Sequence, residues 1–430
     1  MSRADTIAAV ATASGRGGVA VVRLSGSEAY AIARTLVPRL PAPGSFAFAR
    51  FRNQEGELLD EGLVLVFKAP ASYTGEDVVE FQGHGGAVAP RRVLNALLAS
   101  GARLARRGEF TERAFLNGRL GLEAAESVLA LVDAKTDRAA EAALAGLGET
   151  RLKAVRILYD RLLDLSATLE HALDIDEGEL PEDFQSEILR RAADLSEETK
   201  AVRRQLEEGR LLRTGACVVL AGEPNAGKSS LMNALLEEQR VIVSATPGTT
   251  RDAVEAWLDV AGWPVRLIDT AGIREADDPI EAAGVKRARE WLRRADVILA
   301  FDDAAGTLEG ENVGEVIRLH AKCDLGRARG VLNVSSRTGE GLSELRQTLA
   351  AALSRRAESA DFSSESFAPV EATVREALIV CAARLAEVGD DLVLAGNAIR
   401  SAADRLGEVL GLTYREDLLT RLFSRFCVGK

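Results

Sequence analysis

The 430-residue sequence is poor in the residues that build disulfides and structural metal sites. Its four cysteines lie far apart and form no CxxC pair, and its three histidines form no cluster. These absences argue against a structural zinc site, and cysteines used so sparingly are typical of a reducing compartment. No stretch approaches the roughly 20 consecutive apolar residues that a membrane span requires, so we expect no membrane association.

The chain also lacks an excess of positive charge. Its 65 acidic and 54 basic residues give a net charge of −11, which argues against a general polyanion binder but leaves room for a local basic patch that contacts RNA. The N-terminal stretch MSRADTIAAVATASGRGG mimics a signal peptide, yet Asp5 interrupts its short, alanine-rich apolar run. We therefore expect a cytoplasmic protein.

Length and residue pattern indicate several domains. A chain of 430 residues is too long for one ordinary core. Runs of β-branched residues at 19–26, 63–70 and 77–86 are bounded by glycine or proline, which is typical of strands. A helical pattern with a glycine stop follows at 88–101. Residues 1–118 are therefore predicted to form an α+β domain.

Helical sequence brackets an α/β module in the rest of the chain. Residues 119–212 contain apolar positions at steps of 3, 4, 3 and 4, which favours a helix packed in a bundle over a free coiled coil: Val155, Leu158, Leu162, Leu165 and Leu169. The same spacing returns in 356–430, whereas 213–355 alternates short apolar strands with helices. We predict an α-helical bundle domain, built from two separate segments of chain, with an α/β domain inserted into it.

The inserted module opens with a phosphate-binding motif. Residues 222–229, GEPNAGKS, match G-x-x-x-x-G-K-[ST] between an apolar strand and a helical segment. Gly222 and Gly227 let the loop curl so that backbone N–H groups face phosphate oxygens. Lys228 is expected to place its ammonium on the β- and γ-phosphates, and Ser229 to offer its hydroxyl to Mg²⁺. The predicted contacts in this loop are Asn225, Ala226, Gly227, Lys228, Ser229 and Ser230.

Three further segments follow in the order of a translation-factor-class P-loop GTPase. TPGTTRD (246–252) has the form of a switch loop, VRLIDTAG (265–272) ends a strand at Asp269, and NVSSRTGEGL (333–342) has the form of a base-side loop. We therefore predict GTP binding. The remaining predicted nucleotide contacts are Ser244, Ala245, Thr246, Pro247, Gly248, Thr249, Thr250, Asp269, Thr270, Ala271, Gly272, Lys322, Asp324, Ser336 and Arg337.

Two departures from the usual GTPase pattern affect affinity and hydrolysis. Where N-K-x-D normally reads guanine, this chain has AKCD (321–324), which keeps Lys322 and Asp324 but lacks the asparagine. We predict weaker nucleotide affinity, and we leave the choice between guanine and adenine to a comparison of GTP with ATP binding. Ile273 replaces the glutamine that orients water in many relatives. Glu281 is a candidate for that role, although the residues alone favour an exposed carboxylate.

The whole chain resembles the MnmE (TrmE) family of bacterial and organellar tRNA wobble-uridine modification GTPases. The matching stretches are DTIAAVATASGRGGVAVVRLSG, YTGEDVVEFQGHGG, RRGEFTERAFLNGRL, the GTPase motifs and the terminal FCVGK. The resemblance implies an N-terminal domain that binds a tetrahydrofolate derivative (5-formyl- or methylene-tetrahydrofolate) and forms a homodimer. It also implies a heterotetramer with the flavoprotein MnmG, which adds an aminomethyl or carboxymethylaminomethyl group to C5 of the wobble uridine (U34) of tRNA.

The resemblance also assigns roles in the nucleotide site. It implies a GTPase activated by K⁺ when two G domains pair. The implied K⁺ ligands are Asn225, Ser244, Thr246 and Thr249, of which Thr246 would use its backbone carbonyl. Ser229 and Thr250 match the Mg²⁺ ligands, and Lys228 and Glu281 match the catalytic residues.

For the folate, the resemblance implies four binding positions: Arg23, Glu80, Arg119 and Lys430. The cationic side chains can face anionic oxygens, and Glu80 can accept hydrogen bonds from pterin N–H groups. Arg119 stands where relatives carry lysine, which keeps the charge but changes the reach. Cys427, close to the C-terminus, would lie near the one-carbon chemistry, and the sequence leaves open whether it reacts or packs.

Two other hypotheses share the GTPase motifs. A GTPase switch for ribosome assembly explains the phosphate loop but not the N-terminal third. A folate-binding aminomethyltransferase with a vestigial GTPase domain would explain AKCD. The lipid-anchor interpretation of the terminal CVGK fails because Gly429 is not aliphatic and Lys430 suits the last position poorly.

Overall fold

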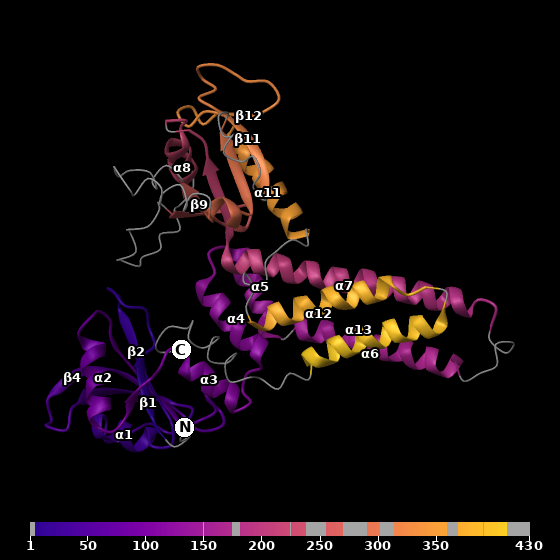
Figure 1. The fold of residues 1–430 in the computed structure, drawn as a ribbon. Helices are drawn as coiled ribbons and strands as arrows, with labels where there is room; N and C mark the ends of the chain where they lie inside the picture. The colour runs from indigo at the N-terminus through magenta and orange to yellow at the C-terminus, as the bar shows by residue number, and fades with distance from the viewer. Residues whose placement is uncertain are drawn as a thin grey trace. The chain divides into compact units, whose positions relative to one another are not determined.

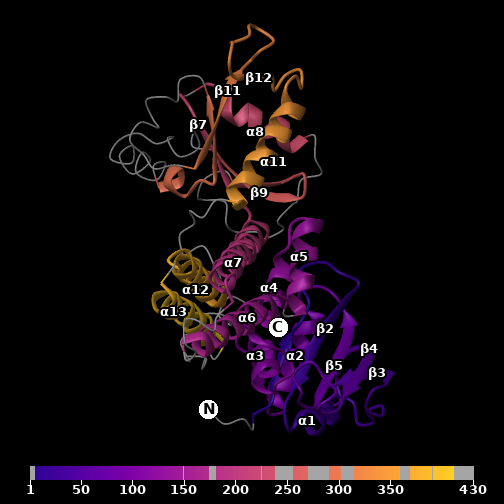
Figure 2. The ribbon, with the colours of Figure 1, turned by 90° about the vertical axis from the view of Figure 1, so that its right-hand side faces the viewer.

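A computed structural model describes residues 5–148, 150–173, 181–223, 225–237, 255–269, 290–301, 314–358, 369–389 and 391–410 of the protein. The chain divides into two compact units, Met1–Leu129 with Leu412–Lys430, and Ala130–Gly411 (Figures 1 and 2). Together they contain the α+β, helical and P-loop α/β parts of the predicted multidomain fold. None of the described helices is long and apolar enough to cross a membrane.

The first unit is built around a six-stranded sheet in the order β3-β4-β5-β2-β1-β6. Its pairs are antiparallel except β1 with β6, which is parallel. The strands are β1 (Ile7–Val10), β2 (Val19–Ser25), β3 (Phe46–Arg52), β4 (Leu58–Phe67), β5 (Val78–His84) and β6 (Arg103–Leu104). The helices are α1 (Ala29–Leu36), α2 (Ala89–Ala99) and α3 (Glu109–Leu116), and the chain passes into the second unit within α4 (Leu122–Asp133).

The two faces of this sheet have different coverings. Helices α1 and α2 bury one face, where their apolar residues pack on alternate positions of the strands, including an edge-to-face pair of Phe51 with Phe81. On the other face Phe110 of α3 packs with Ile7 and Ala9 of β1. Because neighbouring strand residues in register share a face, the pairing of Arg23 with Glu80 places both on this second face.

The predicted strands at 19–26, 63–70 and 77–86 correspond to β2, β4 and β5, whereas β1, β3 and β6 were not predicted. For β1 and β6 the physical reason is composition and length, whereas β3 is a seven-residue strand whose alternating phenylalanines were overlooked. β1 is a four-residue, alanine-rich strand, and β6 has two residues. Such segments gain their strand conformation from neighbours in the sheet rather than from their own propensity.

Five helices of the second unit form a bundle, in which α6, α7, α12 and α13 run side by side (Figures 1 and 2). They are α5 (Asp137–Leu147), α6 (Thr150–Leu173), α7 (Phe184–Thr214), α12 (Pro369–Ala386) and α13 (Leu392–Leu410). All five apolar positions of the predicted seam in α6 are at most 3% exposed, as a packed helix requires. The bundle therefore takes helices from both sides of the inserted α/β part.

The inserted part is a second six-stranded sheet, in the order β12-β11-β10-β7-β9-β8, parallel except for β8. Its strands are β7 (Ala216–Ala221), β8 (Glu255–Val260), β9 (Trp263–Asp269), β10 (Val297–Phe301), β11 (Glu315–Ala321) and β12 (Leu332–Val334). Helices α8 (Lys228–Glu237) and α11 (Leu342–Glu358) share one hydrophobic cluster with one face of this sheet. Residues 291, 292 and 295 pack on the other face.

A buried ion pair joins the bundle to the inserted sheet. Arg210 of α7 donates to Asp296 over 2.7 Å, and the second carboxylate oxygen of Asp296 accepts from the backbone N–H of Cys217 over 2.9 Å. Both charged side chains are under 10% exposed. Nearby, Arg138 of α5 stacks on Trp263, with its guanidinium carbon 4.0 Å from the ring centroid. These contacts fix the end of α7 against the edge of the sheet where β7 and β10 begin.

Candidate functional site

The phosphate loop lies between the central strand β7 and the N-terminus of α8. Every residue of β7 is buried, so the loop starts from a rigid strand. Asn225 and Gly227 have positive φ angles of 64° and 100°, which turn the backbone sharply before the helix begins. A Cβ on Gly222 would stand 2.8 Å from the Cβ of Phe301, so only glycine fits between β7 and β10. This loop at a helix N-terminus can bind a phosphate anion.

Lys228 and Ser229 connect this loop to its surroundings. The ammonium of Lys228 donates to the carbonyl oxygens of Gly222 and Glu223 over 2.9 and 2.7 Å. The hydroxyl of Ser229 donates to Oδ2 of Asp269, at the end of β9, over 2.5 Å. A hydroxyl beside a carboxylate offers the hard oxygen ligands that Mg²⁺ prefers, so these residues fit a magnesium ion.

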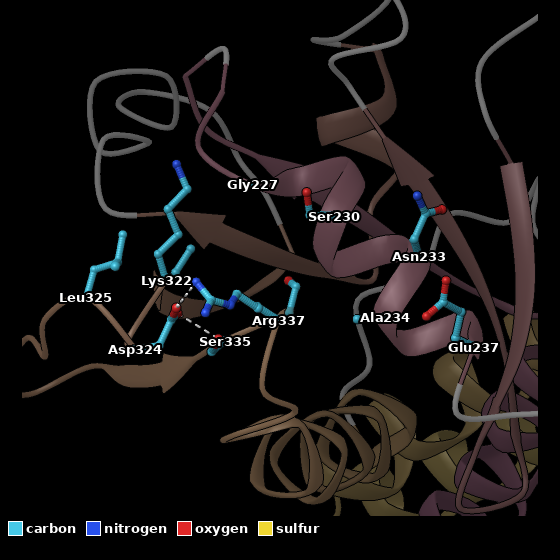
Figure 3. A pocket seen from close by; sticks show the side chains of 12 residues that line it. Gly227, Ser230, Asn233, Ala234, Glu237, Lys322, Asp324, Leu325, Ser335 and Arg337 are labelled. Atoms are coloured by element: carbon cyan, nitrogen blue, oxygen red, sulfur yellow. Dashed lines mark hydrogen bonds and ion pairs between the residues drawn. The ribbon is translucent and has the colours of Figure 1, made fainter.

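A cavity of about 510 Å³ lies beside the phosphate loop, between α8 and the ends of β11 and β12 (Figure 3). The ammonium of Lys322 donates to the carbonyl oxygen of Asn225 over 3.2 Å and so ties this cavity to the phosphate loop. Asp324 accepts from the hydroxyl of Ser335 over 2.7 Å, and Arg337 lies 4.0 Å from its other oxygen. The carboxylate of Asp324 is thereby held at the cavity, where it can accept hydrogen bonds from the N–H groups of a base.

The alanine of AKCD lies at the end of β11 and lines the cavity beside Gly227 of the phosphate loop. Ala321 is the register partner of Val334, which is 1% exposed, and it packs against the hydrophobic cluster that α8 and α11 share. Alanine therefore leaves this side of the cavity without the polar amide that an asparagine would supply.

The structure brings together the predicted contacts of the phosphate loop, Asp269 and the base-side residues. The cavity is lined by Gly227, Ser230, Lys322, Asp324, Ser336 and Arg337, among others. Ser335, Asn233 and Glu237 also line it and were not predicted; the quoted NVSSRTGEGL loop was the only signal for Ser335. The remaining predicted residues lie outside the described part of the chain: Ser244, Ala245, Thr246, Pro247, Gly248, Thr249, Thr250, Thr270, Ala271, Gly272, Glu281, Cys427 and Lys430.

A second group of charged residues lies on the face of the first unit's sheet that Phe110 of α3 packs against. The Nε of Arg23 donates to Oε1 of Glu80 over 2.8 Å, and both side chains are at most 20% exposed. The guanidinium carbon of Arg23 lies 5.2 Å from the ring centroid of Tyr73 and 5.5 Å from that of Phe110. The Nε of Arg119 donates to the carbonyl oxygen of Ser72, beside Tyr73, over 3.2 Å. Three of the four predicted folate positions therefore lie around the segment 72–75.

Tyr73 and Phe110 were missed by sequence reasoning, although both lie in the quoted stretches YTGEDVVEFQGHGG and RRGEFTERAFLNGRL. Burial raises the pKa of Tyr73, partly offset by its hydrogen bond with Thr111 and by the charge of Arg23. The phenol therefore stays neutral at physiological pH and keeps its 2.8 Å hydrogen bond with the hydroxyl of Thr111.

Comparisons with known proteins account for nearly the whole chain. The family described as the GTP-binding protein TrmE N-terminus matches residues 6–119, and the MnmE helical domain matches residues 122–427. A tRNA modification GTPase MnmE from Halorhodospira halophila is 43% identical over 99% of this chain and 96% of its own length. The protein of that name from Symbiobacterium thermophilum is 41% identical over 99% of both chains.

Solved structures of other GTPases match about a third of the chain. Aquifex aeolicus Era, crystallised with GDP and AlF4⁻, is 28% identical with a TM-score of 0.26, and the match covers 32% of this chain and 56% of that one. The G domain of the T. maritima FeoB iron transporter is 29% identical with a TM-score of 0.25, covering 32% of this chain and 98% of that one. On the strength of the family models and the full-length relatives, the chain belongs to the MnmE family of tRNA modification GTPases.

Proposed function

We propose that this GTP-hydrolysing enzyme acts with the flavoprotein MnmG to add an aminomethyl or carboxymethylaminomethyl group to C5 of the wobble uridine of tRNA. A tetrahydrofolate derivative supplies the one-carbon unit. The observation that carries the folate part of the proposal is the convergence of Arg23, Glu80 and Arg119 around the segment 72–75. A GTPase switch for ribosome assembly would give these N-terminal residues no role.

The nucleotide site supports a GTPase in which Mg²⁺ and K⁺ both take part. Ser229 would hold Mg²⁺, which neutralises charge on the phosphates when bound, and Asp269 would act on the ion indirectly, through the hydroxyl of Ser229. The backbone carbonyl oxygen of Asn225, in the phosphate loop, accepts a hydrogen bond from Lys322. The side chain of Asn225 is the proposed K⁺ ligand. We further propose that Thr250 completes the Mg²⁺ site, that Ser244, Thr246 and Thr249 complete the K⁺ site, and that Glu281 positions water for hydrolysis.

Exposed apolar residues at the β3–β4 end of the first unit's sheet support a homodimer. Phe46 and Phe48 on the edge strand β3 are each 67% exposed, and Leu63 opposite Phe48 is 37% exposed. The strand register places these three residues on the same face as Glu80 and Arg23. An exposed apolar patch that continues into a charged site is typical of an interface, and a second copy of this chain is its proposed occupant.

Two measurements test the proposal. Hydrolysis of GTP should be much faster in K⁺ than in Na⁺, and equal rates in the two salts would remove the proposed role of Asn225. In a strain that lacks this protein, wobble uridine should stay unmodified, and neither the Lys228→Ala variant nor the Arg23→Ala variant should restore it. Restoration by Lys228→Ala would point instead to a folate-dependent transferase with a vestigial GTPase domain, and normal modification in the strain to a different function.

A further inference from the structure

We propose that Tyr73 and Phe110 are positioning residues for folate binding: their rings hold the guanidinium of Arg23 so that its two terminal amino groups are kept for the ligand. This inference rests on the proposed folate site and adds two residues that touch Arg23 rather than the folate itself. The two terminal amino groups of Arg23 would bind a planar ligand group that presents two acceptor atoms, such as a carboxylate or an amide-like edge of the pterin.

Three directions of contact fix Arg23. Both aromatic rings lie within about 6 Å of its guanidinium carbon, the range in which an aromatic face attracts a cation. The third contact is its Nε hydrogen bond to Glu80, whose other oxygen lies 3.5 Å from the amide nitrogen of Gln82. No hydrogen bond within the described chain uses the terminal amino groups of Arg23. The guanidinium is therefore held through its Nε and its two faces, and none of the described residues uses its two terminal amino groups.

The two rings are themselves held rigidly. Thr74, next to Tyr73, is fully buried and hydrogen-bonds Ser25 through its hydroxyl over 2.8 Å, while its carbonyl accepts from Asn117 over 2.8 Å. Phe110 is fully buried beside β1, and Thr111, the next residue, hydrogen-bonds Tyr73. A guanidinium that is already oriented loses less conformational entropy when a ligand binds.

This arrangement explains why arginine rather than lysine suits position 23. A guanidinium is planar and stacks on aromatic rings while donating in a fork, whereas an ammonium is a compact, strongly hydrated charge with no plane to orient. Tyr73 should therefore matter for binding only when residue 23 is arginine, which distinguishes positioning from general support of the fold.

The test measures the Kd of 5-formyltetrahydrofolate by titration calorimetry on the full-length protein. Variants are Tyr73→Leu, Tyr73→Phe, Arg23→Lys and the double variant Arg23→Lys/Tyr73→Leu. We expect Tyr73→Leu to raise the Kd by about tenfold, since a partly desolvated cation–ring contact contributes roughly 1–2 kcal/mol. Tyr73→Phe keeps the ring and should stay within about threefold of the wild type. Hydrogen exchange of α1 and α2 checks that each variant remains folded.

The double variant decides between the interpretations. If Tyr73→Leu weakens binding about tenfold in the parent protein but less than about threefold when residue 23 is lysine, the ring acts through the guanidinium. An equal loss in both backgrounds, or no loss from Tyr73→Leu while Arg23→Lys weakens binding, overturns the inference. Failure of the wild-type protein to bind 5-formyltetrahydrofolate would instead refute the proposed folate site.

Discussion

Replacing Glu109 with glutamine should destabilise α3 in a strongly pH-dependent way. One carboxylate oxygen accepts from Arg103 and Arg113 over 2.6 and 3.2 Å, and the other accepts from Arg103 and the backbone N–H of Arg106 over 3.1 and 2.7 Å. The side chain is 3% exposed. Burial by itself would raise the pKa of Glu109, but the hydrogen bonds from Arg103 and Arg106 outweigh it and lower the pKa from 4.5 to about 2.

The magnitude follows from the difference between the pKa values of the folded and unfolded states. A fall from 4.5 to about 2 stabilises the folded state by roughly 3 kcal/mol at neutral pH. Because the folded-state pKa of Glu109 is the lower one, this contribution is complete above pH 4.5 and disappears as the pH falls towards 2. Glu109→Gln should therefore cost about 3 kcal/mol at pH 7 and much less at pH 3.

Hydrogen exchange of the α3 amides in the full-length protein, corrected for intrinsic rates, measures this loss at both pH values. Glu112→Gln is the matched control, because Glu112 belongs to the same helix but pairs with a half-exposed Arg106 over 2.9 Å. An exposed pair of this kind contributes about 0–1 kcal/mol. Equal losses in the two variants, or a loss from Glu109→Gln that is the same at pH 7 and pH 3, would refute the reasoning. Since α3 carries Phe110, loosening this helix should also weaken folate binding.

Three other predictions concern single contacts. Asp296→Ala removes the carboxylate that pairs with buried Arg210 over 2.7 Å and accepts from the backbone N–H of Cys217. The free energy of unfolding of the second unit, followed by tryptophan fluorescence, should therefore fall by about 3–5 kcal/mol, and a fall under about 1 kcal/mol would contradict this. Arg138→Ala removes the guanidinium that stacks 4.0 Å from the ring centroid of Trp263. The backbone amides of β8 and β9 should then exchange faster, whereas those of α13 should be unchanged and serve as the control. The carboxylate of Asp60 accepts a hydrogen bond from Nδ1 of His84 and raises the pKa of His84. The pair therefore stabilises the folded state at pH values where His84 is protonated, and this contribution is lost as the pH rises through the raised pKa. An NMR titration of His84 should show the raised pKa, and Asp60→Asn should return it towards the ordinary value.

The sequence by itself determined those features of the protein that depend on residues close together in the chain. The phosphate loop needs four residues of fixed type within a stretch of eight, and the apolar seam of α6 needs only steps of 3 and 4, so both were evident without the structure. The order of the segments was enough to predict a P-loop α/β module inserted into a helical bundle. Full-length similarity to MnmE proteins then confirmed the family.

Only the tertiary structure decided how distant residues combine. Arg23, Tyr73 and Phe110 come from a strand, a connecting segment and a helix, and only the sheet register and the packing of α3 bring them together. Ser335 reaches Asp324 because β11 and β12 lie side by side. Such contacts depend on long-range pairing, which no local periodicity encodes, and for that reason the aromatic positioning of Arg23 became visible only in the folded chain.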